Sequence, residues 1–313
     1  MGLKIGVVGA GAIGGFLTAR LEASGTPVHV LARNRTRDAL IENGLTLVSE
    51  ADRITVRPAM VSADPAEIGP VDICVFTVKG QDTEQAADAM RPMIGDHTRI
   101  LSFQNGLFGV ETLAHLFGAR HVLAGVTYVP ASVQEPGVVR HTGAVTRFVF
   151  GPLVADSACS AAREMAAAGQ AAGLDMACLD DPMPEIWAKM ALLTPFHLVS
   201  AMTRRALGDW IDVPETRALY HQGMQEVVAV AQARGVRFSE DIVARNMAFS
   251  VHTADRRTRA SMLDDIEQGR PLELDATVGW LIAQARQLGI PAPMHEFGYG
   301  AIKPLINGAD QVA

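Results

Sequence analysis

The chain is predicted to be an α/β protein, with a doubly wound parallel sheet in its first part and a second, all-helical domain. Three observations predict this class. Strand-like apolar runs alternate with helical patterns through the first half, a glycine-rich turn joins the first strand to the first helix, and strand-like runs stop after residues 180–184. Such alternation is typical of a parallel sheet with helices on both faces. We therefore place the first domain at residues 1–181 and the second at residues 182–313.

The first strand ends in a glycine-rich turn. An apolar run at residues 3–8 precedes the turn, an amphipathic stretch follows it, and a second apolar run covers residues 28–32. In this βαβ context the first glycine permits the turn, the second lets the backbone approach a pyrophosphate, and the third brings helix against strand. We predict a Rossmann-type dinucleotide site whose turn residues are Gly9, Ala10, Gly11, Ala12, Ile13 and Gly14.

The residues after the second predicted strand indicate which dinucleotide is bound. Enzymes that use NAD place an Asp or Glu about 20 residues past the glycines to bind the ribose hydroxyls. This chain has Ala32-Arg33-Asn34-Arg35 there. A guanidinium group suits a 2′-phosphate, so we predict NADPH/NADP as cofactor with Arg33 as a ligand. The alternative is that these arginines are simply solvated.

The alternation continues through the first domain. Strands are predicted at residues 45–49, 54–56, 71–78, 99–103, 121–128 and 146–150, and helices at 82–90, 108–117 and 161–172. Residues 131–140 predict an antiparallel hairpin that extends the sheet, with Pro136-Gly137 at its turn. Lys79 and Asn105 follow two of the strands, at the edge where open α/β sheets bind ligands. Ordinary loop positions are the alternative for both.

The first predicted helix of the second domain carries a polar face. It begins near Pro184 and contains Pro195, which should bend it. Lys189, Leu193 and His197 recur at intervals of four residues and share one face. A lysine in such apolar surroundings either extends to solvent or is held in a pocket.

A later segment adds two candidates. A predicted helix that contains Ser261 is ended by Gly269, and Glu273 starts the next helix. The alternatives are a polar helix residue for Ser261 and a carboxylate that interacts only with the helix dipole for Glu273.

Composition excludes several classes of protein. The 313 residues carry a net charge of −7, which argues against a nucleic-acid-binding or membrane-surface protein. The three cysteines show neither disulfide nor metal-ligand spacing, so we expect no metal. Because the first strand begins almost at once and no apolar run is long enough to span a membrane, we expect a cytoplasmic protein whose partner is a small molecule.

Taken together, the motifs resemble the ketopantoate reductase (2-dehydropantoate 2-reductase) family, whose known members belong to pantothenate biosynthesis. The resemblance covers essentially the whole chain. It rests on residues 9–15, 78–79, 104–106, 185–189, 261–265 and 273–275. It implies NADPH-dependent reduction of a 2-oxoacid, an active site between a Rossmann domain and a helical domain, and a possible homodimer.

The resemblance also implies roles for single residues. Lys189 would be the general acid that protonates the carbonyl oxygen, and Glu273 would contact the cofactor. Lys79 and Asn105 would lie between cofactor and substrate, and Ala131 would meet the cofactor through its backbone. Ser261 would bind the substrate carboxylate.

The chain departs from the family at the substrate. In the family, asparagines lie four and eight residues after the lysine, where this chain has Leu193 and His197. Two further family asparagines are replaced here by Thr258 and Val278. A site that loses such polar contacts discriminates differently among substrates. We expect a relative that acts on another 2-oxoacid, with a more apolar side chain against Leu193 and with His197 as a hydrogen-bonding or charged group.

Four hypotheses stay open at this point. They are an NADPH-dependent reductase of another 2-oxoacid, a ketopantoate reductase that tolerates these substitutions, a D-2-hydroxyacid dehydrogenase that works oxidatively, and a non-catalytic NADPH sensor. Lys189 and Glu273 disfavour the sensor, which needs no proton donor.

Overall fold

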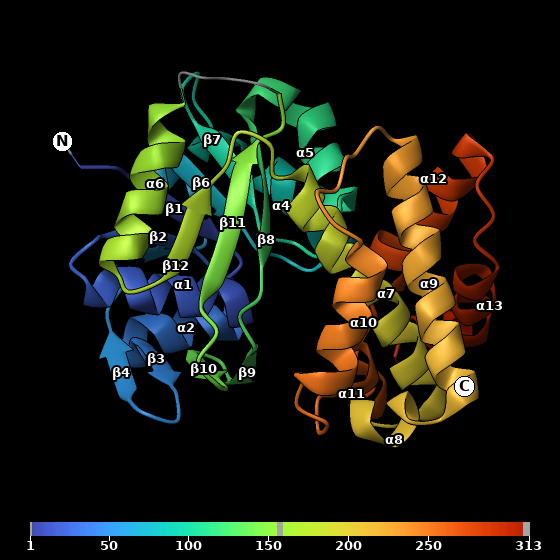
Figure 1. The fold of residues 1–313 in the computed structure, drawn as a ribbon. Helices are drawn as coiled ribbons and strands as arrows, with labels where there is room; N and C mark the ends of the chain where they lie inside the picture. Colours follow the sequence, from blue (N-terminus) through green and yellow to red (C-terminus); the bar gives the residue numbers. More distant parts are fainter. Residues whose placement is uncertain (1, 155–158, 309–313) are drawn as a thin grey trace. The chain divides into compact units, whose positions relative to one another are not determined.

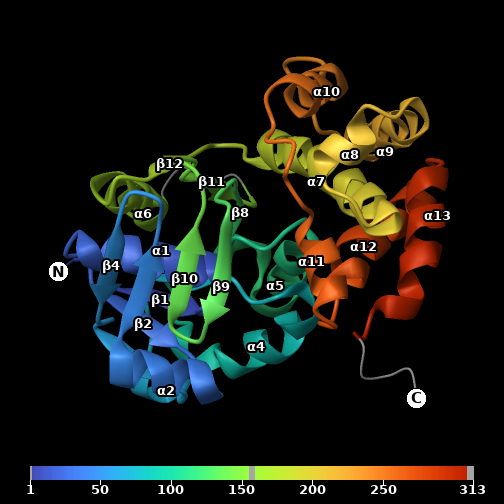
Figure 2. The ribbon, with the colours of Figure 1, turned by 90° about the horizontal axis from the view of Figure 1, so that it is seen from below.

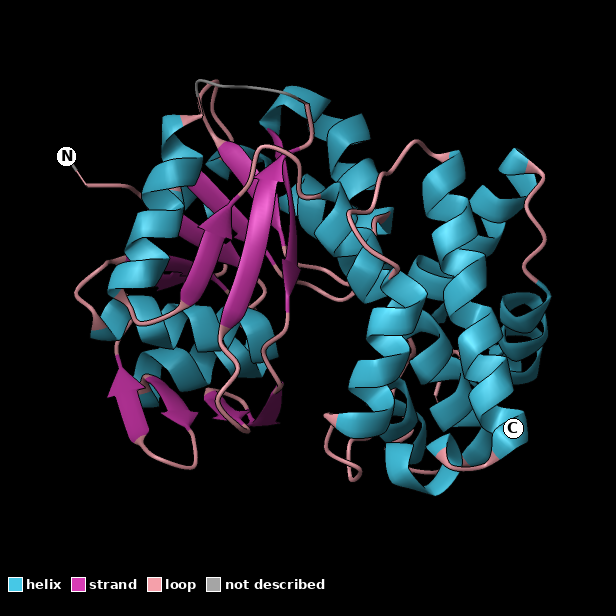
Figure 3. Ribbon diagram, viewed as in Figure 1, coloured by secondary structure: helices cyan, strands magenta, loops and turns pink. Residues whose placement is uncertain are grey.

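The computed structural model describes residues 2–154 and 159–308, and the chain divides into two compact units, Met1–Pro182 and Met183–Ala313. The first unit contains strands and helices, whereas the described part of the second contains helices and no strand (Figure 3). The mixed α/β class with a helical C-terminal part is therefore confirmed.

The first unit is built around an eight-stranded sheet with the order β12-β11-β8-β7-β6-β1-β2-β5 (Figure 1). Its strands are β1 (Ile5–Val8), β2 (Val28–Leu31), β5 (Met60–Ser62), β6 (Ile73–Phe76), β7 (Arg99–Ser102), β8 (Val122–Thr127), β11 (Arg147–Pro152) and β12 (Asp175–Cys178). Neighbours pair in parallel except β8 and β11, which are antiparallel. The strand order reverses beside β1, and open α/β sheets bind ligands at that point, beyond the carboxyl ends of the strands.

Helices connect these strands. They are α1 (Ala12–Ala23), α2 (Asn34–Asn43), α3 (Pro65–Ile68), α4 (Thr83–Ala89), α5 (Phe108–Phe117) and α6 (Ser160–Ala171), with short 3₁₀ turns at Gly80–Asp82, Arg91–Met93 and Ala119–His121. All four residues of β6 are buried, as expected for a central strand with helices on both faces.

The predicted hairpin forms, but it does not extend the main sheet. Strands β9 (Ala131–Glu135) and β10 (Val138–His141) pair with each other, and β10 pairs with β3 (Leu45–Val48), which in turn pairs with β4 (Arg53–Val56). These four strands make a second sheet (Figure 2). Only four residues join β3 to β4, too few for a crossover, so the pair is antiparallel and cannot continue the parallel alternation. The place beside β2 is taken instead by β5, a three-residue strand that the apolar pattern did not predict.

Helix α1 lies between the two sheets and is buried on both sides. Phe16 packs against Phe148 of the main sheet and His141 of the second, with ring centroids 6.2 and 4.9 Å apart. The sequence predicted an amphipathic helix after the glycines. The helix is not amphipathic, because a sheet covers it on each side.

The second unit packs its helices around α7 (Met183–Thr203), which runs through Pro195 without a break. The other helices are α8 (Leu207–Ile211), α9 (Pro214–Ala233), α10 (Ile242–His252), α11 (Ser261–Glu267), α12 (Trp280–Leu288) and α13 (Pro293–Ile302), with a π-helix at Asp275–Gly279 and a 3₁₀ turn at Lys303–Leu305. Trp210, Tyr220 and Met224 lie in its core with Leu198 of α7. None of the described helices is both long and apolar enough to span a membrane.

A Gly14→Ala substitution should destabilise the first unit. A Cβ at Gly14 would lie 2.1 Å from the Gly9 carbonyl oxygen and 2.5 Å from Thr77 Oγ1, so helix and strand must separate. We expect a loss of about 1–3 kcal/mol in urea-induced unfolding. Gly11→Ala is the matched control, because a Cβ there meets nothing within 4 Å and should leave stability nearly unchanged. Equal stabilities of the two variants would contradict this account.

Candidate functional site

The glycine turn of the first unit has the geometry of a phosphate-binding loop. Gly9 follows β1 with φ +96°, a conformation that favours glycine. Thr77 Oγ1 donates to the Gly9 carbonyl oxygen at 2.7 Å and fixes the turn. Gly14 then lies directly against Gly9, so the N-terminus of α1 begins at the end of β1.

The surroundings of Gly11, the N-cap of α1, indicate whether this turn could hold a dinucleotide. A Cβ at this position would meet nothing within 4 Å, so packing inside the protein does not require glycine. The first turn of α1 has no acidic residue, and no side chain caps it. The amides of this turn and the positive end of the helix dipole therefore suit an anion. The open space at Gly11 would admit a pyrophosphate close to the backbone, so the turn fits the predicted cofactor.

Arg33 lies at the N-cap of α2, directly after β2 and the buried Ala32. Its side chain is exposed. Arg37 pairs with Asp38 at 2.6 Å, whereas no ion pair of Arg33 occurs within residues 2–154 and 159–308. Arg33 is therefore the more available guanidinium group for a 2′-phosphate.

Lys79 and Asn105 follow β6 and β7, which are neighbouring parallel strands. Both side chains are half-buried. Lys79 precedes the 3₁₀ turn at Gly80, and Asn105 precedes Gly106, whose φ is +82°. Ala131 instead opens β9 in the second sheet, where its amide donates to the Val129 carbonyl oxygen at 3.1 Å.

Lys189 is the candidate catalytic residue of the second unit. It lies on α7, half-buried, and burial lowers its pKa from 10.5 to about 8, while the charge of Glu273 acts in the opposite direction. Glu273 is also half-buried and comes just before the π-helix, where Thr277 Oγ1 donates to its carbonyl oxygen at 2.7 Å. Short π-helices are frequent at functional sites. The structure thus brings Lys189 and Glu273 within electrostatic reach of each other.

His197 lies within electrostatic reach of Lys189 and Asp265. It is 5% exposed, and burial together with the Lys189 charge lowers its pKa to about 4, whereas Asp265 acts to raise it. Asp265 is buried on α11 and pairs with Arg270 at 2.6 Å. His197 is therefore neutral at pH 7. The expectation that it carries a charge is disfavoured, and a hydrogen-bonding role is left.

The remaining predicted substrate positions differ in exposure. Leu193 is half-buried on α7 between Lys189 and His197, and Ser261 is exposed as the first residue of α11. Val278, at a position where the family has asparagine, is fully buried in the core of the unit and is thus an apolar packing residue.

A buried polar network that holds α7 was not predicted from the sequence. His295, fully buried on α13, contacts Glu226 Oε2 of α9 through Nδ1 at 2.7 Å and Thr194 Oγ1 of α7 through Nε2 at 3.0 Å. Burial acts to raise the pKa of Glu226, but hydrogen bonds from His295 and the Met294 amide outweigh it and lower that pKa. The sequence did contain a feature that could have predicted this network: Glu226 and His295 are ionisable residues inside apolar helical segments.

The network fixes the turn of α7 that carries Lys189. Thr194 Oγ1 donates to the Met190 carbonyl oxygen at 3.1 Å, and Asn246 Nδ2 of α10 donates to the Ala188 carbonyl oxygen at 2.9 Å. These bonds hold the main chain on both sides of Lys189.

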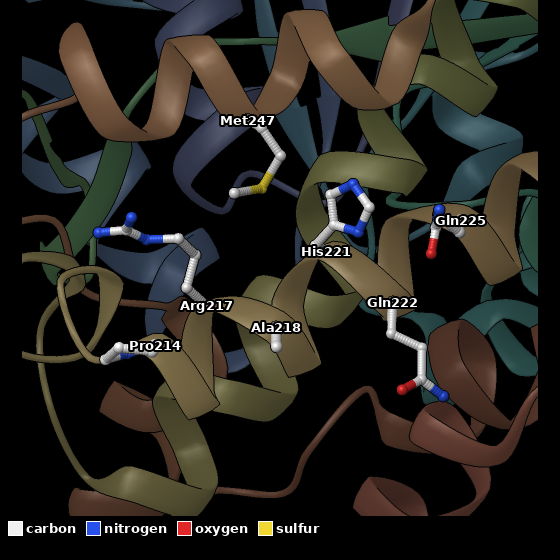
Figure 4. A pocket seen from close by; sticks show the side chains of 7 residues that line it. All are labelled: Pro214, Arg217, Ala218, His221, Gln222, Gln225 and Met247. Atoms are coloured by element: carbon white, nitrogen blue, oxygen red, sulfur yellow. The ribbon is translucent and has the colours of Figure 1, made fainter.

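A separate groove lies between α9 and α10. It measures about 640 Å³ and is lined by Pro214, Arg217, Ala218, His221, Gln222, Gln225 and Met247 (Figure 4). None of the predicted site residues is among them. Within the described residues no group of three or more His, Cys, Asp or Glu side chains could hold a metal ion.

Comparison with known proteins identifies the family. Residues 5–155 match the family described as ketopantoate reductase PanE/ApbA, and residues 181–305 match its C-terminal domain. A 2-dehydropantoate 2-reductase of Mesorhizobium japonicum is 31% identical over 93% of this chain and 94% of its own length. The chain belongs to the ketopantoate reductase family. The family resemblance inferred from the motifs is confirmed.

Solved structures agree with this assignment. The 2-dehydropantoate 2-reductase of Geobacter metallireducens has a TM-score of 0.89 at 32% identity, covering 96% of this chain and 99% of that one. A D-mandelate dehydrogenase solved with NADH and anilino(oxo)acetate shares the fold, with a TM-score of 0.86 at 18% identity over 97% and 98% of the two chains. As a ketopantoate reductase family member, the chain is an oxidoreductase, and the family implies a nicotinamide cofactor.

Replacing Lys189 with methionine should stabilise the protein at neutral pH. The folded-state pKa of about 8 lies below the ordinary 10.5, so between these values the unfolded chain binds more protons and stability rises with pH. Lys189→Met removes the buried ammonium group and should add on the order of 1–3 kcal/mol to the free energy of unfolding at pH 7, with a smaller gain at pH 10. Urea-induced unfolding at the two pH values measures this.

Lys303→Met is the control for this prediction. Lys303 lies in the same unit, but its side chain is 42% exposed and pairs with Asp275 at 2.6 Å. Its loss should change stability by at most about 1 kcal/mol, in the unfavourable direction. If Lys189→Met gives no gain at pH 7, the ammonium group of Lys189 is not desolvated.

Proposed function

We propose that this ketopantoate reductase family member reduces a 2-oxoacid to a 2-hydroxyacid with NADPH, and that Lys189 is the general acid. The substrate is 2-dehydropantoate or a related acid. The observation that carries the proposal is Lys189 itself. Its pKa is lowered to about 8, it lies within electrostatic reach of Glu273, and hydrogen bonds hold the main chain of α7 on both sides of it. A general acid works best when its pKa lies near the working pH.

The residues of the first unit hold the cofactor in this proposal. The amides at Gly11 and in the first turn of α1 bind the pyrophosphate, and Arg33 binds the 2′-phosphate. Lys79, Asn105, the Ala131 backbone and Glu273 would contact the cofactor, with Lys79 and Asn105 between cofactor and substrate. The open space at Gly11 supports pyrophosphate binding at this turn. The absence of an acidic residue from the first turn of α2, directly after β2, supports the preference for NADP.

The bound cofactor supplies a hydride to the carbonyl carbon of the substrate. Negative charge then develops on the carbonyl oxygen, and the Lys189 ammonium group stabilises it and transfers a proton to it. Since the pKa of Lys189 is about 8, most molecules carry the proton at pH 7, yet release is easier than from an exposed lysine. The Glu273 carboxylate favours the charged form and so keeps the proton available.

Leu193 and His197 select the side chain of the substrate. Leu193 offers an apolar contact, and His197 is neutral with a pKa of about 4, so neither attracts a second carboxylate. Burying a second charge without a partner is costly. We therefore propose a monocarboxylic 2-oxoacid with an uncharged side chain, whose carboxylate binds the Ser261 hydroxyl.

Initial rates of NADPH and NADH oxidation test the proposal directly. The panel should contain 2-dehydropantoate and branched, aromatic and dicarboxylic 2-oxoacids, and the reverse reaction should be measured with D-2-hydroxyacids. We expect NADPH-dependent turnover of an uncharged monocarboxylic acid. Faster oxidation of hydroxyacids with NAD would favour an oxidative dehydrogenase. Tight NADPH binding without turnover of any acid would favour a sensor.

Lys189→Met should remove the general acid without removing the cofactor site. We expect kcat to fall roughly 10²–10⁴-fold, while the Kd for NADPH, measured by fluorescence titration, changes little. Lys303→Met is again the control and should keep the wild-type kcat. Undiminished turnover by Lys189→Met would exclude Lys189 as the proton donor.

Arg33→Asp should reverse the choice of cofactor. The new carboxylate repels a 2′-phosphate and can accept hydrogen bonds from ribose hydroxyls, so NADPH should weaken at least about tenfold more than NADH. Ratios of kcat/KM for the two cofactors measure the preference. Arg37→Asp, which alters an arginine already paired with Asp38, should leave the ratio near that of the wild type. An unchanged ratio in Arg33→Asp would assign the 2′-phosphate to another residue.

A further inference from the structure

Gln104 is a buried polar residue for which the proposed function gives no role. It follows β7 and immediately precedes Asn105, and its side chain is only 7% exposed. Its amide Nε2 donates to the Val78 carbonyl oxygen at 3.0 Å and to Thr83 Oγ1 at 2.8 Å. Its Oε1 accepts from Ser102 Oγ at 3.2 Å. Both amide N–H groups are thus used inside the protein, so Gln104 itself does not bind a ligand through them.

These hydrogen bonds fix the main chain on both sides of Lys79. Val78 directly precedes Lys79, and its carbonyl group is held by Gln104. Gly80 directly follows Lys79, and its carbonyl oxygen accepts from Thr83 Oγ1 at 2.8 Å, the same hydroxyl that accepts from Gln104. The Gln104 amide therefore ties the segment after β6, which carries Lys79, to the segment after β7, which carries Asn105.

Helix α5 leaves room for this side chain. A Cβ on Gly109 would lie 1.9 Å from Gln104 Oε1 and 2.6 Å from its Cδ, so only glycine fits there while Gln104 keeps its place. Gly109 is buried in the first turn of α5. Its φ lies outside the left-handed region, so the requirement for glycine comes from the side chain of Gln104 and not from the backbone.

We propose that Gln104 is a positioning residue for the dinucleotide site, which sets the spacing between Lys79 and Asn105 by hydrogen bonds across the ends of β6 and β7. The inference rests on the proposed function, in which these two residues contact the cofactor. Gln104 acts only through them. Its loss should therefore weaken cofactor binding in addition to lowering the stability of the unit.

Gln104→Met tests the inference, because methionine has similar length and no N–H donor. The readout is the equilibrium Kd for NADPH, measured by fluorescence titration without substrate, beside the thermal midpoint. We expect Kd to rise about tenfold or more, as loss of a buried amide pair predicts. Gln170→Met is the control for loss of an amide donor elsewhere in the unit: Gln170 is exposed, and its Nε2 donates to the Met176 carbonyl oxygen at 2.8 Å, between α6 and β12. It should lower the midpoint less than Gln104→Met does and keep Kd within about twofold.

Variants of Thr83 give an independent test that does not depend on the folding of Gln104→Met. Thr83→Val removes both the acceptor for Gln104 and the donor to Gly80, so it should raise Kd like Gln104→Met, whereas Thr83→Ser keeps the hydroxyl and should restore wild-type binding. A Kd for Gln104→Met or Thr83→Val no higher than that of the Gln170→Met control overturns the inference. Failure of the wild-type protein to bind NADPH is a different result, and it would overturn the proposed function instead.

Discussion

The close contact between α1 and the turn after β1 is the constraint on which the first unit depends. Gly14 lies so near the Gly9 carbonyl that no side chain fits between helix and strand. This contact places α1 between the two sheets, where Phe16 joins the core of both. The amides at the start of α1 are thereby held by the hydrophobic core rather than by a free loop, so an anion can bind without first ordering them.

The second unit depends on a different kind of constraint, the burial of charge. Lys189 is partly withdrawn from water, and the lowered pKa that suits its proposed role as proton donor is also a cost to folding. Glu273 offsets part of that cost. The hydrogen bonds of Thr194 and Asn246 then hold the main chain around Lys189, and His295 with Glu226 supports Thr194 from two other helices. The desolvation that lowers the pKa of Lys189 thus costs folding free energy, and the neighbouring residues offset that cost.

Local patterns predicted the elements well where the residues of a segment by themselves determine its type. The glycine turn, the buried β6 and the helix at Phe108–Phe117 follow directly from apolar periodicity and glycine spacing. The pattern failed where pairing partners decide. It assigned the hairpin at Ala131–Glu135 and Val138–His141 to the main sheet and did not predict β5, because a short strand's partner is chosen by packing and not by its own residues.

The sequence by itself determined the family, the position of the glycine-rich turn and the identity of the candidate lysine, because motif spacing and residue type are local properties of the chain. Only the tertiary structure decided that His197 is neutral and that Gln104 joins two strand ends. The fold also showed that Glu226 and His295, which lie 69 residues apart in the sequence, form a hydrogen bond. Hydrogen bonds and pKa values depend on which distant side chains meet and how much water they exclude, and no local pattern encodes that.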